Sequence, residues 1–386
     1  MKVLIVTSFA GSWPYIPEML EELERCGERA QVFDIDDLGR PGLMAMVAFR
    51  VPKLRYAARL LLLKKRLTLL PGDFDVVNIH FAAPIYRDLA RSLRLRGKKL
   101  ITSIWGSDFL RADPSALRAL GDTLDASDIV TSNNPEVLQR LVARYPSISG
   151  RTRIIRWGLR SLDVIAALQE SESQDETRNK LGVPLGKVVV TCGYNGSRAQ
   201  RHATMIDALA ALSPAVKCRL FALFPMTYPD DPVYRNEVKK SLESARVEYR
   251  IVDVKMSIED ICRIRVASDY AVNIQTTDSL SASIQEHMFA GSSMIVGNWL
   301  PYDVFEKIGV PLQKVATAEE ISAALEKSTV EVTSVRSRPP YASRIYDYSS
   351  WSSNIGKWLE LYSEPTSHRC DRIADTVVGL PTRDQT

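Results

Sequence analysis

Short apolar runs alternate with amphipathic segments along the first 157 residues. Six runs have the length and β-branched content of strands: KVLIVTS, AQVFDID, DVVNIHF, KLITSIW, DIVTSN and RIIRW. Segments between them, such as PEMLEELERCG and EVLQRLVARY, have the periodicity of helices. Strands that alternate with helices in this way predict a parallel α/β sheet.

A polar stretch interrupts this rhythm, and the pattern then restarts. ALQESESQDETRNKLG is typical of a linker that leads into a new helix, so we expect a domain boundary near Gln169 to Lys180. Five more strand-like runs follow: KVVVTCG, CRLFALF, YRIVDV, YAVNIQ and SMIVGNW. The sequence therefore predicts two parallel α/β domains, residues 1–168 and 181–340, which face a cleft. Residues 364–386 show little periodicity and are expected to form a flexible tail.

Composition narrows the class of protein. The chain has 386 residues, 45% of them hydrophobic, as expected for globular cores. Its 50 basic and 46 acidic residues give a net charge of +4, too balanced for a nucleic-acid binder. Five scattered cysteines indicate a reduced, cytoplasmic compartment. The opening MKVLIVTSFAGS is too short for a signal peptide or a membrane span, and predicts a buried strand.

The connector TDSLSASIQEHMFAGSS carries the first sign of chemistry. It links two predicted strands, and its helical part begins near Ala282 with Ser281 as a candidate N-cap. A helix that begins at the carboxyl end of a parallel strand offers free N–H groups to a phosphate. Asp278 and Glu286 lie eight residues apart, about 12 Å along a helix, so they could touch opposite ends of one long ligand. The alternative is a capped helix with solvated acids.

This segment resembles the nucleotide-sugar glycosyltransferases of the GT-B fold, and in particular the retaining family 4 type. Asp278-x7-Glu286 followed by AGSSMIVGNWLPY is similar to the family's E-x7-E helix and the turn and strand after it. The resemblance implies two Rossmann-like, doubly wound domains. It also implies that Glu286 binds the ribose, that Asp278 approaches the donor sugar, and that the backbone at Ser281 and Ala282 meets the diphosphate. The first acid here is aspartate, one methylene shorter than glutamate.

Two glycine turns extend the resemblance. VVVTCGYNGSRAQRHATMIDAL is similar to the family's strand, glycine turn and helix that bring cations to the phosphates, which implies a binding turn at Gly193, Tyr194 and Asn195. Arg198 and Arg201 are the candidate cations, and solvated helix arginines are the alternative. TSFAGSWPYIPEMLEELERCG matches the glycine loop of the first domain, where Gly11 would approach the diphosphate from the opposite side.

SIWGSDFLR resembles the family's H-G-S-D-type loop, with Trp105 where many members carry histidine. Asp108 could accept a hydroxyl proton or bind a sugar hydroxyl, or it could cap the following helix. WGSD also resembles a loop of bacterial fucosamine-type transferases that build cell-surface polysaccharide. DYSSWSSNIGKWLELYSE is similar to the family's last helix, which implies that residues 341–363 cross back to the first domain through Trp351 and Trp358.

No metal site is expected. Asp34 and Asp36 imitate the metal-binding acid pair of another glycosyltransferase fold, but an acid after the second strand can cap or bind a hydroxyl instead. Four histidines and five cysteines form no zinc spacing. His80 ends a predicted strand and either packs in the core or lines the acceptor side.

Residues 43–70 form a basic, apolar stretch without acids. Its cations are Arg50, Lys53, Arg55, Arg59, Lys64, Lys65 and Arg66. Such a segment can lie on an anionic membrane surface, and the alternative is a helix pair packed on the first domain with a solvated basic rim. The first reading would put a cytoplasmic enzyme at the inner face of the cell membrane.

Together these features predict a metal-independent, retaining glycosyltransferase without a cofactor. It would move a sugar from a nucleotide diphosphate to a glycan acceptor, lipid-linked in our interpretation, during assembly of bacterial surface polysaccharide such as O-antigen, capsule or exopolysaccharide. No side chain is an obvious nucleophile, so we expect the departing diphosphate to drive the reaction. A nucleotide-sugar epimerase or a non-catalytic sugar-nucleotide-binding protein could use the same architecture.

Overall fold

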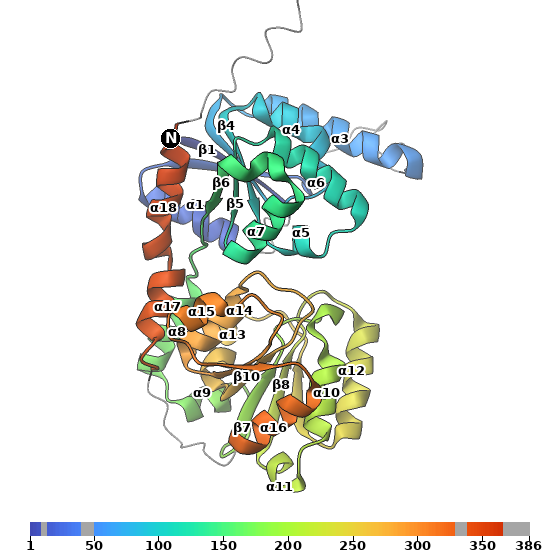
Figure 1. Cartoon of the computed structure of the whole chain (residues 1–386), viewed down its shortest axis with the longest axis vertical. Coiled ribbons are helices and arrows are strands. Elements are labelled where there is room, and N and C mark those ends of the chain that lie inside the picture. The colour runs from blue at the N-terminus through green and yellow to red at the C-terminus, as the bar shows by residue number, and fades with distance from the viewer. Residues whose placement is uncertain (9–13, 40–49, 329–337, 366–386) are drawn as a thin grey trace, which may run out of the picture.

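The computed structural model describes residues 1–8, 14–39, 50–328 and 338–365. Figure 1 shows two α/β lobes, one above the other, with the last two described helices running along one side of both. The predicted loop glycine Gly11, the first part of the basic stretch and most of the predicted tail lie outside the described residues.

The first lobe is built on a six-stranded sheet with the strand order β2-β1-β3-β4-β5-β6, all parallel. Its strands are β1 (Lys2–Thr7), β2 (Arg29–Asp34), β3 (Phe74–His80), β4 (Gly97–Ile104), β5 (Ile129–Ser132) and β6 (Thr152–Ile154). The connecting helices are α1 (Tyr15–Arg25), α3 (Pro52–Leu69), α4 (Tyr86–Arg94), α5 (Ser107–Leu110), α6 (Pro114–Ala126) and α7 (Pro135–Arg144).

Alternation along β1 explains why helices cover both faces of this sheet. Leu4 and Val6 are fully buried in a cluster with residues of α3 and α4, whereas Val3 and Ile5 are buried on the other face against α1. Two of the outer helices begin at an Asp-Pro or Asn-Pro pair. Asp113 and Asn134 each accept two backbone N–H groups of the first turn, so α6 and α7 start where the sequence places a cap before proline.

The second lobe repeats the plan with the parallel order β12-β11-β10-β7-β8-β9. Its strands are β7 (Val188–Cys192), β8 (Leu220–Pro225), β9 (Glu248–Val252), β10 (Tyr270–Asn273), β11 (Ser293–Gly297) and β12 (Leu312–Val315). Its helices are α8 (Ser161–Ser171), α9 (Gln174–Lys180), α10 (His202–Ala210), α11 (Pro214–Lys217), α12 (Pro232–Ala245), α13 (Ile258–Ala267), α14 (Ala282–Ala290), α15 (Asp303–Lys307) and α16 (Ala318–Ser328).

Two sheets of this kind confirm the predicted fold class, and one detail lies outside the expected boundary. The polar stretch leads into a helix, as expected: Ser173 and Glu176 form a capping box at the start of α9. Residues Leu162 and Leu168 of α8 already pack in the core of the second lobe, although they precede the expected boundary.

The chain then returns to the first lobe through α17 (Ala342–Ser349) and α18 (Trp351–Ser363). Trp351 and Trp358 of α18 are buried in the same cluster as Val3 and Ile5 of β1. Tyr362 at its end accepts a 2.9 Å hydrogen bond from Asn78 of β3. The first lobe therefore completes its core with the last helix of the described chain. Among the described residues, none of the helices combines the length and apolar character needed to cross a bilayer.

Candidate functional site

The carboxyl ends of three adjacent strands of the second lobe meet around Gln275. Its side-chain oxygen accepts hydrogen bonds from Tyr194 Oη at 3.1 Å and from Gln200 Nε2 at 3.2 Å. Its backbone carbonyl accepts the indole N–H of Trp299 at 2.9 Å. Gln275 follows β10, and its partners follow β7 and β11. These hydrogen bonds therefore connect the carboxyl ends of the three strands, which form the edge of the sheet where ligands bind in parallel α/β folds.

Two helices begin at this edge, and the first turn of neither helix is capped by its own N-cap side chain. α10 follows β7 and α14 follows β10, and these two strands are neighbours in the sheet. Four buried polar atoms here have no hydrogen-bond partner among the described residues: His202 Nε2, Gln275 Nε2, Ser281 Oγ and Ser283 Oγ. Buried donors without partners are costly, and helix N-termini attract anions, so this edge suits a ligand rich in negatively charged acceptors.

Glu286 lies within α14 and is almost completely buried. One carboxylate oxygen accepts from Ser161 Oγ at 2.7 Å, and the other is paired with Arg265 Nε at 3.0 Å. A carboxylate has about four lone-pair positions, so about two remain for a further ligand. The pKa of the Tyr15 phenol, in the first lobe, is raised mainly by burial and next by the nearby negative charge of Glu286. The carboxylate thus lies near a side chain of the first lobe.

Asp278 precedes α14 and stabilises the turn that leads into this helix. One of its oxygens accepts the backbone N–H of Ser281 at 3.1 Å and the hydroxyl of Tyr302. Burial raises the pKa of the Asp278 carboxyl, and these two hydrogen bonds act in the opposite direction. Ser281 does not cap the helix with its own side chain, and Ala282 is the first helical residue.

The glycine turn after β7 is closely packed. Gly193 has φ +68°, which favours glycine, and a Cβ there would lie 2.9 Å from Gln200 Oε1, so a side chain would displace Gln200. The Gly193 N–H is bonded to the carbonyl of Val272 at 2.9 Å. Tyr194 N–H donates to Gln200 Oε1, and Asn195 Oδ1 accepts from Ser197 N. These backbone groups hold the turn in one shape.

The two predicted cations point in different directions. Arg198 is 57% exposed and makes a two-point ion pair with Glu237 at 2.8 and 3.0 Å, as a solvated helix arginine would. Arg201 has a left-handed backbone with φ +61° at the start of α10. Its guanidinium lies 5.0 Å from the centre of the Trp299 ring, next to the Gln275 junction. Arg201 is therefore the cation at the strand edge.

In the first lobe, Asp108 accepts backbone N–H groups from Ala82 at 2.9 Å, Gly106 at 2.8 Å and Trp105 at 3.1 Å. Burial raises the pKa of its carboxyl, and the three N–H groups oppose this shift. Asp108 thus fixes the loop after β4 against the loop after β3. Asp108 lies within α5, whose N-cap is Gly106, so it is not at the helix-capping position that was the alternative to a sugar or proton contact.

Aromatic rings surround His80 at the carboxyl end of β3. The His80 ring lies 4.8 Å from that of Trp157 and 6.2 Å from that of Trp105, and Tyr15 packs 5.9 Å from Trp105. Burial lowers the pKa of His80 to about 3, so the imidazole is neutral. Trp105, Trp157 and Tyr15 are only half-buried, which gives the first lobe an aromatic wall beside the second.

The lobes touch directly beside Asp278. Asn133, after β5, donates to the carbonyl of Ser279 and accepts from its hydroxyl, both at 2.8 Å. Gly106, after β4, packs so tightly on Ser279 that a Cβ would lie 2.3 Å from the serine Cβ. The first lobe's loop therefore lies next to the segment that carries Asp278.

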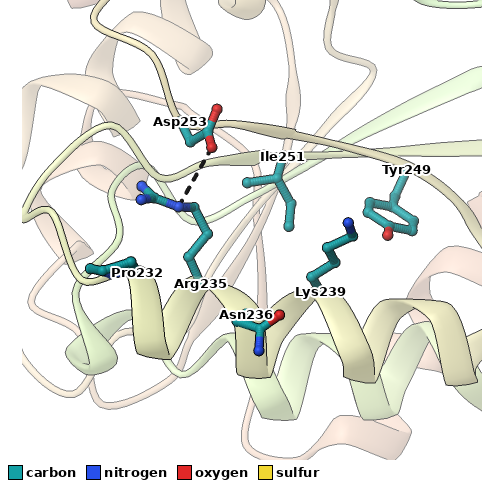
Figure 2. A pocket seen from close by; sticks show the side chains of 7 residues that line it. All are labelled: Pro232, Arg235, Asn236, Lys239, Tyr249, Ile251 and Asp253. Carbon is teal, nitrogen blue, oxygen red and sulfur yellow. Dashed lines mark ion pairs between the residues drawn. The ribbon is translucent and has the colours of Figure 1, made fainter.

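We also considered a surface hollow and groups of acidic side chains as alternative sites. Figure 2 shows a shallow hollow between α12 and the edge strand β9, where Arg235 is paired with Asp253 at 3.5 Å. It contains none of the predicted site residues. Within the ranges that the structure describes, no group of three histidine, cysteine or acidic side chains could hold a metal ion.

The signals that sequence reasoning missed are the partners of the acids. Arg265 and Ser161 lie 21 and 125 residues from Glu286, and nothing in their local sequence links them to it. Tyr302 is 24 residues from Asp278. His202 stands within the quoted glycine-turn segment, where its place at the first helical position after the turn could have marked it as a candidate.

Comparison with known proteins shows a shared fold. No protein-family model matches the chain, and no curated protein matches it in sequence. Sucrose-phosphate synthase from Thermosynechococcus elongatus superposes with a TM-score of 0.71 at 14% identity, over 94% of this chain and 98% of that one. The UDP-forming α,α-trehalose-phosphate synthase of Burkholderia xenovorans gives 0.66 at 13%, over 93% and 97%.

Anabaena HepE, solved in complex with UDP and glucose, gives a TM-score of 0.64 at 15% identity, over 94% of this chain and 99% of that one. These full-length matches cover both lobes together. The protein therefore has the two-lobed GT-B fold.

Proposed function

We propose that this protein is a glycosyltransferase that moves a sugar from a nucleotide diphosphate to a glycan acceptor. The observation that carries the proposal is the pair of helices α10 and α14. They begin at the ends of adjacent strands, beside buried donors that lack partners in the described chain. Two positive helix ends and several free donors match the charge of a diphosphate. The solved neighbours named for UDP-forming synthesis or UDP binding support the same assignment.

In this proposal the residues at the carboxyl ends of the strands have different roles. Glu286, with its unused lone pairs, would accept the ribose hydroxyls, and Asp278 would approach the donor sugar next to the first lobe. Arg201 and the two helix ends would stabilise charge on the departing diphosphate, whose oxygen would help to accept the proton of the incoming hydroxyl. We also propose that the reaction retains the anomeric configuration and needs no metal ion, and both of these points rest on the family resemblance.

We further propose that the acceptor is lipid-linked and that α3 brings the enzyme to an anionic membrane surface, as in bacterial surface-polysaccharide assembly. Leu54, Leu61 and Leu69 are 50%, 70% and 71% exposed, and their spacing of seven and eight residues places them on one side of α3. Lys53 and Lys65 are exposed on the same helix. Apolar side chains between cations are the composition of interfacial helices.

The cations of α3 divide into two sets, which supports this orientation. Arg59 is paired with Asp36 and Arg66 with Asp37, each at 2.8 Å, in the loop after β2. Leu63 and Leu67 are buried beneath them in the first lobe. These contacts fix the inner side of α3 to the lobe and leave the exposed leucines and lysines on the outer side. Figure 1 shows α3 at the periphery of the first lobe, and part of it extends beyond the other helices.

A thermal-shift screen tests the central assignment. Nucleosides, nucleoside diphosphates and nucleotide-diphosphate sugars would be added separately to the full chain. A ligand at about one hundred times its Kd adds about 2.7 kcal/mol to the free energy of unfolding, so a match should be plain. We expect diphosphates to raise Tm more than nucleosides do. If no nucleotide of any class raises Tm, the assignment is wrong.

Product analysis then separates the reaction classes. With the identified donor, a transferase releases nucleoside diphosphate in proportion to added glycan acceptor. Conversion of the donor into an isomeric nucleotide sugar without acceptor would identify an epimerase instead, and binding without turnover under either condition would identify a binding protein.

A further inference from the structure

His202 is a buried histidine with one nitrogen bonded and the other directed at the glycine turn. It is the first residue of α10 and is completely buried. Its Nδ1 lies 3.0 Å from the hydroxyl of Tyr234. Its Nε2 has no partner among the described residues and lies 3.2 Å from the position that a Cβ on Gly193 would take. The ring thus presents one unused polar atom at the carboxyl end of β7.

The hydrogen bond to Tyr234 decides which nitrogen carries the proton. If Tyr234 donates to Nδ1, its hydroxyl proton is satisfied and the ring proton lies on Nε2. If Nδ1 donates instead, the buried phenol proton has no acceptor that the structure describes, which is costly. The first arrangement is favoured, and it makes Nε2 a hydrogen-bond donor.

The surroundings of His202 keep the ring neutral. Burial lowers its pKa to about 4, so the imidazole is uncharged near pH 7. The ring packs against Phe224 at 5.9 Å and Tyr234 at 5.7 Å. Arg198 is the cation on the outer side of Tyr234, with its guanidinium 4.3 Å from the centre of that ring, and Glu237 neutralises it.

The chemistry of the unused groups indicates an acceptor-rich ligand. His202 Nε2 and Gln275 Nε2 are both N–H donors without partners, on adjacent strand ends connected through Gln200. The first turn of α10 lies at the same place because His202 opens that helix, although the backbone N–H of His202 itself is bonded to the Tyr234 hydroxyl. Donors alone would leave a hydroxyl or amide ligand half-satisfied, whereas a phosphate offers only acceptors.

We propose that His202 binds the diphosphate of the nucleotide-sugar donor through a neutral Nε2–H, and that Tyr234 is the positioning residue that sets this tautomer. This inference rests on the proposed function. In this arrangement Arg198 acts indirectly: its guanidinium packs on the ring of Tyr234 and does not contact the ligand. A neutral donor, His202, would hold the leaving group beside the cation Arg201, which directly precedes it in the chain.

Affinity measurements with three variants test the contact. The Kd of a nucleoside and of its diphosphate would be measured by calorimetry for His202→Leu, His202→Gln and Tyr234→Phe. A hydrogen bond to a charged ligand is worth about tenfold or more in affinity. We expect His202→Leu to lose that factor for the diphosphate only, His202→Gln to keep part of it through its amide N–H, and Tyr234→Phe to fall between wild type and His202→Leu.

Nitrogen-15 NMR of the unmodified protein tests the tautomer directly. The chain has 4 histidines, and the signal of His202 is assigned as the one lost in His202→Gln. We expect the Nε2–H tautomer in the free protein, an Nε2–H shift on adding nucleoside diphosphate but not nucleoside, and a mixture of tautomers in Tyr234→Phe. This readout does not depend on whether His202→Leu folds.

Three results would overturn the inference. The first is a free protein with the proton on Nδ1. The second is an unchanged His202 signal when the diphosphate is bound. The third is an equal ratio of diphosphate to nucleoside affinity in wild type and in a folded His202→Leu. Failure of the unmodified protein to bind any nucleotide overturns the proposed function itself, and so the two failures are distinguishable.

Discussion

Glu286 combines a proposed ligand contact with a structural ion pair, and a single substitution cannot separate them. Its carboxylate is paired with Arg265, and the two side chains are only 9% and 6% exposed. Removing one partner of a buried pair costs about 3 to 5 kcal/mol because the other charge stays buried. We therefore expect Glu286→Ala to lose both stability and donor affinity.

A double variant resolves the two effects. Glu286→Met with Arg265→Met removes both charges, and such apolar replacements are often neutral for stability. We expect denaturant unfolding to show recovery of most of the free energy that either single variant loses, while calorimetry shows donor affinity still reduced. A stable double variant that binds the donor as tightly as wild type would remove Glu286 from the ribose site.

At the same scale, the local pattern predicted where these residues lie in the fold, and their roles stay predictions. Asp278 precedes α14, Glu286 lies within it, and Gly193 has the positive φ of a glycine turn. The direction of a side chain was not accessible in this way. Arg198 and Arg201 are three residues apart, yet the left-handed backbone at Arg201 sends one to the strand edge and the other to α12.

Secondary-structure elements were predictable when their hydrophobic pattern was strong. All eleven runs proposed from the sequence overlap strands. Inner strands such as β1, β4 and β7 are almost entirely buried, and parallel strands buried on both faces are nearly continuous apolar runs. The twelfth strand, β12, was missed. It is an edge strand of the sequence LQKV in which only Val315 is buried, so its pattern resembles that of a loop.

Helix α3 yields a prediction about membrane binding. Replacing Lys53, Lys64 and Lys65 by glutamine removes three cations from it, each worth about 1 kcal/mol near an anionic leaflet. We expect co-sedimentation with anionic vesicles to fall by about a hundredfold in partition coefficient and to weaken with salt. Arg59 and Arg66 stay unchanged because they are paired within the first lobe.

A matched control removes the same charge from the second lobe: Lys239, Lys240 and Lys255 are exposed there and would also become glutamine. This control should bind vesicles almost like wild type. Equal losses in both triple variants, or equal binding to neutral and anionic vesicles, would favour the alternative of a packed helix with a solvated basic rim.

The whole molecule depends on contacts that no local pattern contains. The first lobe is completed by α18, whose Trp358 donates its indole N–H to the carbonyl of Arg156 at 2.9 Å, 202 residues earlier. Buried Glu18 of α1 accepts the indole N–H of Trp351 at 2.8 Å. The return of the last helix was expected from family resemblance, whereas these partners require the folded chain.

The contact between Gly106 and Ser279 leads to a prediction about how the lobes close. Gly106 has φ +113°, and an added Cβ would lie 2.3 Å from the Ser279 Cβ in the opposite lobe. Gly27 is the matched control, since it has φ +81° with nothing within 4 Å of its Cβ position. Both alanine variants carry backbone strain, which is larger at Gly106 because its φ +113° and ψ −63° lie outside the left-handed helical region, but only Gly106→Ala must also push the lobes apart.

We therefore expect Gly106→Ala to have a larger radius of gyration by small-angle X-ray scattering than Gly27→Ala. It should also lose sugar transfer, because Asp278 and the first lobe no longer meet at Ser279. Binding of nucleoside diphosphate should persist, since the edge around Gln275 belongs to the second lobe alone. If the two variants scatter alike and transfer alike, the contact is not maintained in solution, and closure does not depend on this pair of residues.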